Sequence, residues 1–509
     1  MSVYRDANIR LSETVHPQLT ATCLPGPDES VLGQYARMRP QLAAFHAFDK
    51  AHIVMLAEQR LLDRADAAAM LRVFRDMEQS DPIKIRAATS ENMHSGEALL
   101  VQALGKEIAG KLHLGRSSGD LLAVSFRMTL RARLLDLLEE LGGLRKDLVQ
   151  LARRHVDTVM PGYTHLQHAQ PLTFGHYLLS MLSGFDRDME RFRAFYARLN
   201  QSPAGAAILV GSAFPLDRHR TAKLLGFDGL ALNTRDAVWG RDLEIEAHAL
   251  ATILAGNVNR LAEDLMLWSA PEYGMVECAD GLCGTSSIMP QKKNPNGLEH
   301  LKGLVATSSG LLVSAVVVNK NPSTAPVFEW IHALSDHWRS YDELISGLPL
   351  MRAVLQTLVV HGERMETLAG SHGATITDLA ALIVEQAGRS WRNAHQIAGI
   401  AVRLALEAGK TPSAIDAEIL ERASGLLDGR TLGLPMSAIA NALDARASVS
   451  RQQLPGGPSA ARMAEALALH EASLDADTAW LSSTLQSQAD AAQELESAID
   501  GLLADDRTG

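Results

Sequence analysis

The chain has 509 residues, which gives room for about two to four ordinary domains or for one long helical body with smaller parts at its ends. Hydrophobic residues make up 47 % of the chain and charged residues 21 %, so a disordered, collagenous or low-complexity protein is excluded. The net charge of -11 at pH 7 comes without any basic cluster, and this argues against a nucleic-acid-binding surface.

Residues that interrupt helices are scarce, with 19 Pro and 38 Gly, and aromatic residues make up only 5 % of the chain. The composition therefore predicts an all-α fold. The cysteines Cys23, Cys278 and Cys283 are too few for a disulfide framework and lack further ligands at zinc-site spacing, which favours a reducing cytoplasm. The sequence shows no apolar leader and no stretch of about 18 uncharged apolar residues, so we expect a soluble, cytoplasmic protein with no membrane partner.

The first predicted helices lie over residues 40–80, where apolar and charged residues alternate at helical spacing. A long helix follows between residues 130 and 155, because its apolar positions step alternately by three and four residues. These positions are Leu134, Leu137, Leu141, Leu144, Leu148 and Leu151. Similar seams return over residues 174–192, 250–268 and 298–312. Long antiparallel helices with such seams predict a central bundle, and the scarcity of charge within 243–268 predicts a helix buried on all sides, in part by other subunits.

Glycine and proline cluster in predicted loops over residues 202–215, 271–285, 432–435 and 455–458. A final helical region begins near residue 366. The chain is therefore predicted to have an N-terminal helical domain over residues 1–115, a central helix-bundle domain over 116–365 and a C-terminal helical domain over 366–509. Within the central domain, a loop over residues 274–297 carries an unusual density of hydroxyl, amine and amide side chains.

The second half of that loop reads GTSSIMPQKKNPNG over residues 284–297. The pattern GxxxxGK[ST] of a phosphate-binding loop is absent from it. A helix start with Asn294 as N-cap and Pro295 in the first turn explains its end, but not the serine pair or Lys292. This combination therefore indicates a site with its own chemistry.

The segment resembles the GSSxMPxKxNP signature of the fumarase/aspartase superfamily, and its MPQKKNP part resembles the argininosuccinate lyases in particular. Thr285 stands where the family usually has glycine. Three earlier segments carry the same resemblance: ENMH at 91–94, GRSSGD at 115–120 and MPGYTHLQ at 160–167. Together with similarity over residues 200–211, 377–379 and 392–395 and in the PGGP turn, the likeness extends over about nine tenths of the chain.

The resemblance implies a three-domain fumarase/aspartase-type fold with a central long-helix bundle, assembled as a homotetramer with a twenty-helix core. It also implies active sites shared between subunits and a small-molecule dicarboxylate substrate. In this family a base removes the proton from Cβ of the substrate, and the carbanion delocalises into the neighbouring carboxylate. The C–N or C–O bond then breaks to give fumarate, and no cofactor is needed.

The resemblance assigns Ser286 as the base. A serine hydroxyl needs its oxyanion stabilised, and Lys292 with the backbone amides of the loop would supply that field in a dry site. His165 is expected to relay a proton to the leaving nitrogen, directly or through water, because imidazole exchanges protons near neutral pH. In the family this histidine is paired with a glutamate, and Glu299 stands at the matching position. A solvated charge on a helix face is the alternative for Glu299.

Lys292 and Asn294 are expected to hold the substrate carboxylate that gains charge, the first by its ammonium group and the second by its amide. Hydroxyl groups are expected to bind the other carboxylate oxygens: those of Ser117, Thr164 and Ser287. The remaining residues expected to line the substrate site are His94, Arg116, Ser118, Gln167 and Met289. No metal site is predicted, since His165, His168 and His176 match no standard ligand spacing.

Two segments depart from the argininosuccinate lyase pattern. The family reads SRNDQ where this chain has SSGDL at 117–121, and YNKDLQ where it has VNKNPS at 318–323. Losing several hydrogen-bonding partners at once should remove selectivity for the guanidino amino acid. We therefore expect a carbon–nitrogen lyase that cleaves another N-substituted aspartate to fumarate plus an amine or other nitrogen compound. A genuine argininosuccinate lyase and a catalytically silent structural relative are the two alternatives.

Overall fold

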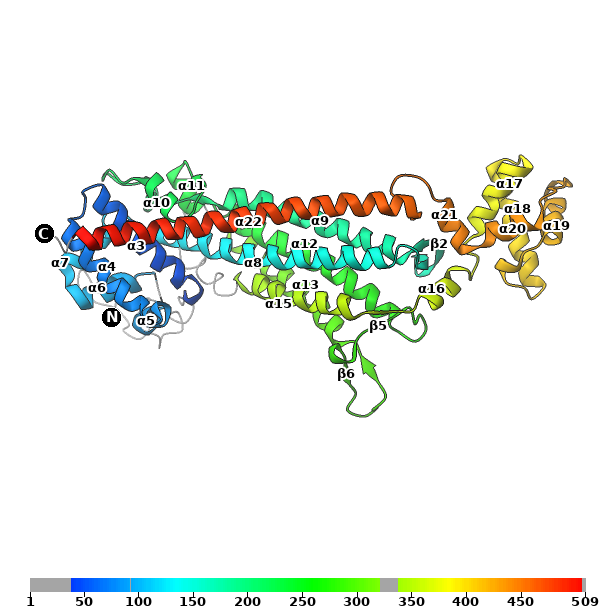
Figure 1. Cartoon of the computed structure of the whole chain (residues 1–509), viewed down its shortest axis with the longest axis horizontal. Helices are drawn as coiled ribbons and strands as arrows, with labels where there is room; N and C mark the ends of the chain where they lie inside the picture. The colour runs from blue at the N-terminus through cyan, green and yellow to red at the C-terminus, as the bar shows by residue number, and fades with distance from the viewer. Residues whose placement is uncertain (1–37, 92, 321–336, 506–509) are drawn as a thin grey trace.

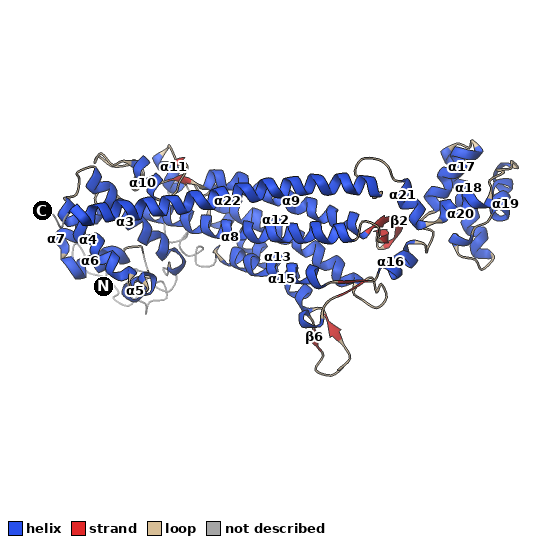
Figure 2. Cartoon of the chain, viewed as in Figure 1, coloured by secondary structure: helices blue, strands red, loops and turns tan. Residues whose placement is uncertain are grey.

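The computed structural model describes residues 38–91, 93–320 and 337–505. Within these ranges the chain is mainly helical, and its short strands form two-stranded ladders (Figure 1, Figure 2). The predicted all-α fold is confirmed. Features expected at Cys23, at Asn92 and at residues 321–323 lie outside the described residues.

Long helices lie side by side to form the predicted central bundle (Figure 1). They are α8 (Ser118–Arg154), α9 (Phe174–Leu199), α12 (Asp242–Trp268), α13 (Asn296–Val318), α15 (Arg339–Thr357) and α22 (Ala460–Asp505). The seam from Leu134 to Leu151 lies on α8, and each of its leucines is at most 2 % exposed. The other predicted seams lie on α9, α12 and α13. Hydrophobic periodicity therefore located most of the bundle.

Helix α8 begins at a reciprocal cap that the sequence supplies. The Ser117 hydroxyl accepts a hydrogen bond from the backbone N–H of Gly119 at 3.4 Å, and Asp120 Oδ1 accepts one from the N–H of Ser117 at 2.8 Å. This capping box satisfies two N–H groups that have no partner inside the helix. The helix continues for 37 residues. At the α-helical rise it therefore spans about 55 Å.

The N-terminal group of helices packs around the start of α8. It consists of α3 (Leu42–Glu58), α4 (Arg64–Glu78), α5 (Pro82–Thr89), α6 (Ser95–Leu104) and α7 (Lys106–Ala109), with α10 (Arg218–Leu224) and α11 (Thr234–Trp239) nearby. Single 3-10 turns are η2 (Arg39–Gln41), η3 (Gly110–His113), η4 (Asp280–Leu282) and η5 (Pro412–Ala414). Helix α5 illustrates how the sequence sets a helix start, since Asp81 caps it and Pro82 takes the first position.

The C-terminal group has a hydrophobic core of its own, separate from that of the bundle. Its helices are α17 (Ile376–Ala387), α18 (Trp391–Glu407), α19 (Ala417–Asp428) and α20 (Met436–Leu443), with α16 (Gly362–Ala369) and α21 (Ala445–Arg451) leading to and from it. Helix α22 then runs back along α8 and α9, and its residues Met463, Leu467, Leu495 and Ile499 belong to the bundle core (Figure 1). The range 366–509 therefore contributes to two cores. The domain boundaries at residues 115 and 365 stay a prediction.

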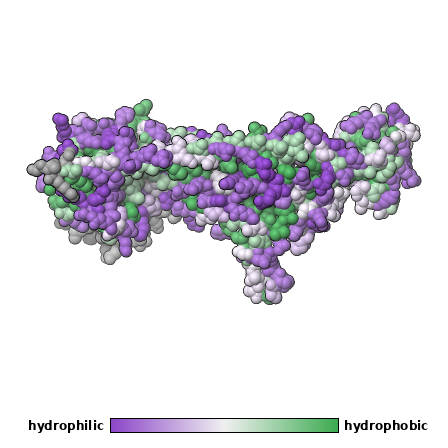
Figure 3. Space-filling model, viewed as in Figure 1, coloured by the Kyte–Doolittle hydropathy of each residue, from purple (hydrophilic) through white to green (hydrophobic). Residues whose placement is uncertain are grey.

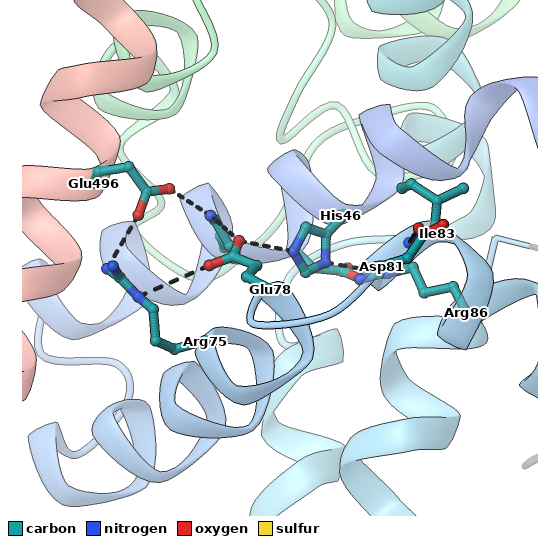
Figure 4. A network of polar contacts seen from close by, with 9 residues as sticks. His46, Arg75, Glu78, Asp81, Ile83, Arg86 and Glu496 are labelled. Atoms are coloured by element: carbon teal, nitrogen blue, oxygen red, sulfur yellow. Dashed lines mark hydrogen bonds and ion pairs between the residues drawn. The ribbon is translucent and has the colours of Figure 1, made fainter.

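A charge network around the buried Lys50 joins the end of α22 to the N-terminal helices (Figure 4). Lys50 is 6 % exposed, and its Nζ donates to Glu78 and Glu496 at 2.5 Å each. Arg75 pairs with Glu496 at 3.0 Å. A hydrogen bond with His46 lowers the pKa of Glu78 to about 2, so this carboxylate stays charged at neutral pH.

The strands form short ladders at the margins of the bundle. Antiparallel pairs are β1 (Val159–Thr164) with β2 (Gln167–Thr173), β5 (Val276–Glu277) with β8 (Val359–Val360), and β6 (Gly284–Thr285) with β7 (Lys293–Asn294). A parallel pair joins β3 (Gln201–Ser202) to β4 (Gly229–Leu230). The β1–β2 and β6–β7 ladders carry residues predicted for the active site.

Helix α13 exposes much apolar surface within the single chain. Val313, Val316 and Val317 are 63 %, 49 % and 51 % exposed, and hydrophobic surface interrupts the mostly hydrophilic middle of the bundle (Figure 3). By length and composition alone α13 could cross a membrane, contrary to the expectation that no such stretch exists. Only 22 % of its most apolar window is buried in this chain. On the neighbouring α12, Ile253 is 41 % exposed. The predicted burial of that helix on all sides is therefore not reached within one chain.

Candidate active site

The β6–β7 hairpin carries the signature loop and projects from the bundle (Figure 1). The register of the two strands places residues 286–292 at the tip of the hairpin. At its base, Lys293 Nζ pairs with Glu277 at 2.7 Å and with Asp280 at 2.6 Å. Ion pairs therefore hold the base, while the tip extends into solvent.

Ser286 lies where the chain leaves β6 and turns sharply. Its Oγ accepts hydrogen bonds from the backbone N–H groups of Ile288 at 3.3 Å and Met289 at 3.0 Å. The N–H of Lys292 in turn donates to the carbonyl oxygen of Met289 at 3.0 Å, which closes the turn. Two amide donors directed at one hydroxyl oxygen stabilise negative charge on it, as a serine base requires.

The other predicted residues of this loop lie around Ser286. Ser287 and Lys292 are exposed, Met289 is 42 % exposed, and Asn294 is half-buried on β7. Glu299 is exposed in the first turn of α13. Among the described residues, no hydrogen bond or ion pair joins Glu299 to another side chain. Both interpretations of Glu299 therefore stay open within one chain.

A second group of predicted residues forms the turn between β1 and β2. Thr164 pairs with Gln167, so His165 and Leu166 are the two residues of the hairpin turn. Both have a positive φ, 53° for His165 and 57° for Leu166. Such turns favour Asn and Gly, and bulky side chains there carry backbone strain, which marks functional sites in many proteins. The side chains from Thr164 to Gln167 are all exposed.

A third group lies where α6 meets the start of α8. His94 Nε2 is 3.0 Å from Ser118 Oγ, and burial lowers the pKa of His94 to about 4. Ser117 caps α8 beside it. The Arg116 guanidinium, by contrast, points into the N-terminal core, where its Nη1 is 2.7 Å from Asp49 Oδ1 and its side chain is 2 % exposed. Within this chain Arg116 therefore holds the segment in place and presents no exposed group to a ligand.

The structure explains why Gly and Asp stand at positions 119 and 120, which the sequence alone did not reveal. A Cβ on Gly119 would lie 3.0 Å from the Val238 side chain and 3.1 Å from the Ala207 carbonyl oxygen. The glycine therefore also allows close packing of α11 and of the loop at Ala207 on α8. Asp120 is fully buried beside this contact, and burial raises the pKa of its carboxyl to about 6.

The segment after α13, predicted to line the leaving-group pocket, contacts a buried carboxylate. Asn319 Nδ2 donates to Glu244 Oε2 at 3.1 Å, and His337 at the other side contacts Oε1 of the same group. Glu244 and His337 are 1 % and 2 % exposed. Burial lowers the pKa of His337 to about 3. Sequence reasoning missed this cluster because its members are far apart in the chain.

The structure keeps the three groups of predicted residues apart within one chain. His94 and Ser118 lie at the start of α8, whereas the β1–β2 turn follows the end of that helix, about 55 Å away along its axis. The signature hairpin projects from the bundle between them (Figure 1). A single chain therefore does not bring Ser286, His165 and Ser118 into one site.

Comparisons with known proteins identify the family. The family model described as "Lyase" matches residues 34–309, and the model described as "Argininosuccinate lyase C-terminal" matches residues 373–450. An argininosuccinate lyase from Methanosarcina mazei is 35 % identical over 88 % of this chain and 91 % of its own. One from Methanoculleus marisnigri is 36 % identical over 89 % of both chains.

A solved structure of EDDS lyase in complex with formate has a TM-score of 0.87 and 31 % identity, and the match covers 97 % of each chain. The chain therefore belongs to the fumarase/aspartase superfamily and, within it, to the argininosuccinate lyase-like lyases. It is a carbon–nitrogen lyase. The relatives also bear out the resemblance seen in the signature loop.

Proposed function

We propose that the protein cleaves an N-substituted aspartate by β-elimination and releases fumarate plus an amine or other nitrogen compound. The observation that carries this proposal is the Ser286 hydroxyl, which accepts two backbone N–H groups on the signature loop. The departures in the sequence at residues 117–121 and 318–323 favour a substrate other than argininosuccinate. A similar lyase is itself named for EDDS, so substrates differ between members of this group.

In the proposed reaction Ser286 removes the proton from Cβ, and its oxyanion is stabilised by the loop amides and by Lys292. The electron pair of the C–H bond moves into the carboxylate held by Lys292 and Asn294, whose charge grows toward the transition state. It then forms the C=C bond of fumarate as the C–N bond breaks. His165, supported by Glu299, gives a proton to the leaving nitrogen.

The remaining predicted residues bind and position the substrate in this proposal. Hydroxyl and amide groups on three segments would hold its carboxylates: Ser117, Ser118, Thr164, Gln167 and Ser287. His94 orients Ser118 through their 3.0 Å contact, and Met289 forms an apolar wall. Arg116 acts as a positioning residue through its ion pair with Asp49.

We further propose that the protein works as a cytoplasmic homotetramer whose sites combine residues of different subunits. The separation of Ser118, His165 and Ser286 along one chain supports this arrangement, because the proposed chemistry needs them together. The exposed valines of α13 and Ile253 of α12 offer apolar surface for such an assembly.

Argininosuccinate is the second candidate substrate, favoured by the 35 % identity to enzymes named for it. A catalytically silent relative is the third possibility, and the retained Ser286, Lys292, Asn294 and His165 argue against it. The two substrate hypotheses and the silent one make different predictions for fumarate release.

The test is a screen of N-substituted aspartates with purified protein, read by the ultraviolet absorbance of fumarate. The reverse reaction, fumarate with a panel of amines, identifies the leaving group by mass spectrometry of the adduct. Ser286→Ala serves as the control for contaminating activity. Turnover of another N-substituted aspartate well above argininosuccinate supports the proposal, and no fumarate from any substrate would leave the silent relative as the answer.

A further inference from the structure

Two histidines and a buried glutamate converge beside the start of α8. Glu97 Oε2 lies 3.3 Å from His113 Nδ1 and 3.9 Å from His94 Nδ1. One ligand atom from each of the three side chains lies within 4.8 Å of the other two. Glu97 is 5 % exposed, and the two histidines are half-buried. None of the reaction steps proposed above uses Glu97 or His113.

The local fold explains why these side chains meet. His94 is the N-cap of α6 and Glu97 lies in its first turn, three residues on, so both face the same side. His113 ends the η3 turn, which packs against α6. The other ring nitrogen of His94, Nε2, lies 3.0 Å from Ser118 Oγ. This contact orients the imidazole so that Nδ1 faces Glu97.

We propose that His94, Glu97 and His113 form a binding site for a divalent first-row transition ion of the zinc class. Two imidazole nitrogens and one carboxylate oxygen are the donor set of three-ligand zinc sites, which leave a fourth position for water or another ligand. Zinc bonds of about 2.0–2.1 Å in a tetrahedron place ligand atoms about 3.3 Å apart. The His113–Glu97 separation of 3.3 Å already has this value, and the His94–Glu97 separation of 3.9 Å exceeds it by about 0.6 Å.

The proposed ion would join α6 to the η3 turn and, through His94, to Ser118 on α8. It goes beyond the proposed lyase reaction, in which no step involves a metal. A hydrogen bond or proton shared between the imidazoles and Glu97 is the competing use of the same three groups. Direct measurement of metal binding distinguishes these two alternatives, because only a zinc site takes up zinc in a fixed ratio to the chain.

The test uses the full-length protein, stripped with a chelator, dialysed and titrated with Zn²⁺ by calorimetry at neutral pH. The bound metal is then counted by elemental analysis after desalting. We expect one zinc per chain. The His113→Ala and Glu97→Gln variants should each weaken binding at least about tenfold, and Ser118→Ala should weaken it by a similar factor through loss of the orienting contact. His219→Ala, an exposed histidine on α10, is the matched control and should bind as the wild type does.

X-ray absorption of the zinc-loaded wild type gives a second readout that does not depend on the folding of any variant. Scattering from two imidazoles and one carboxylate oxygen would support the site. Zinc retained at full affinity by both His113→Ala and Glu97→Gln, or no stoichiometric zinc in the wild type, would overturn the proposal. Neither measurement needs a substrate, so a failure of the zinc-site proposal can be distinguished from a failure of the proposed lyase function.

Discussion

The Oγ of Ser286 lies 3.0 Å from the backbone nitrogen of Met289, and it accepts the hydrogen bond from that N–H group. The loop therefore places an amide donor against a hydroxyl oxygen three residues earlier. Removal of the hydroxyl proton would leave an oxyanion that this donor and the N–H of Ile288 already face. This geometry supports the proposed role of Ser286 as the base.

We expect Ser286→Ala to lower kcat by about a thousandfold or more, because the variant has no group to remove the Cβ proton. Steady-state kinetics of fumarate release, with circular dichroism and gel filtration to check fold and assembly, measure the effect. Ser287→Ala, the exposed neighbour, should lose far less. A Ser286→Ala enzyme within tenfold of the wild type would assign the base to another residue.

Lys292→Met should raise KM and lower kcat together. The charge that Lys292 meets is present in the bound substrate and grows in the transition state, so both parameters depend on it. The matched control is Lys302→Met on α13, where Lys302 pairs with Glu263 away from the signature loop. Unchanged kinetics with an altered melting temperature would make Lys292 a structural residue.

Asp120→Asn should change how stability depends on pH. The folded-state pKa of about 6 lies above the ordinary value of 3.8, so the folded chain binds the proton more tightly than the unfolded chain. This contribution is full below the unfolded pKa and is lost as pH rises through about 6. The variant should therefore gain up to about 3 kcal/mol relative to the wild type between pH 4 and pH 7, as an order of magnitude.

Chemical denaturation of wild type and Asp120→Asn across this pH range checks the prediction. Asp136→Asn changes an exposed carboxylate on the same helix and is the control. A stability difference that stays constant with pH would show that Asp120 is ionised in the same way in both states.

We expect kcat/KM for argininosuccinate to lie at least roughly 100-fold below that for the native substrate. Losing two hydrogen bonds at about 1.5 kcal/mol each accounts for this factor. A Cβ on Gly119 would lie only 3.0 Å from the Val238 side chain, so the side chain that the family places there would be tightly packed, and Asn319 donates to Glu244. Rapid turnover of argininosuccinate, or rescue of an arginine-requiring strain at ordinary expression, would contradict the expectation.

Mixing two inactive variants should restore activity if subunits share sites. Ser286→Ala and His165→Ala each lack one group, and some mixed tetramers would contain a site in which both groups come from intact segments. The proteins are unfolded and refolded together, and fumarate release is compared with that of each variant refolded alone. No recovery from mixtures that form tetramers would argue against shared sites.

Much of the fold could be predicted from the sequence because the periodic signal is local. The seam from Leu134 to Leu151 determines a helix and its buried face without reference to any other segment. The return of α22 along the bundle could not be found in this way. Its pairing of Glu496 with Lys50 depends on contacts between residues far apart in the chain, on which periodicity carries no information.

The candidate site likewise has features that local sequence motifs predict and others that depend on contacts between distant residues. The signature loop was visible as a motif, and the structure adds the two amides that face Ser286. The inward direction of Arg116 depends on Asp49, and the convergence of Glu97 with His113 depends on how α6 meets η3. Neither follows from spacing in the sequence. The roles of the predicted residues stay predictions until the variants are measured.

The charge network that joins Lys50 to Glu496 also means that the N-terminal helices cannot finish packing until the end of the chain has been synthesised. These two residues are separated by 446 positions. At translation rates of about 5–20 residues per second, roughly 20–90 s pass between synthesis of the N-terminal helices and synthesis of the part of α22 that covers them. Through that interval Lys50 of a nascent chain has Glu78 as a partner but not Glu496. The apolar surface that α22 covers is exposed until that helix is made. We therefore expect ribosome-associated chaperones to bind the nascent chain for much of its synthesis. Helix α22 covers N-terminal helices that were synthesised more than four hundred residues earlier.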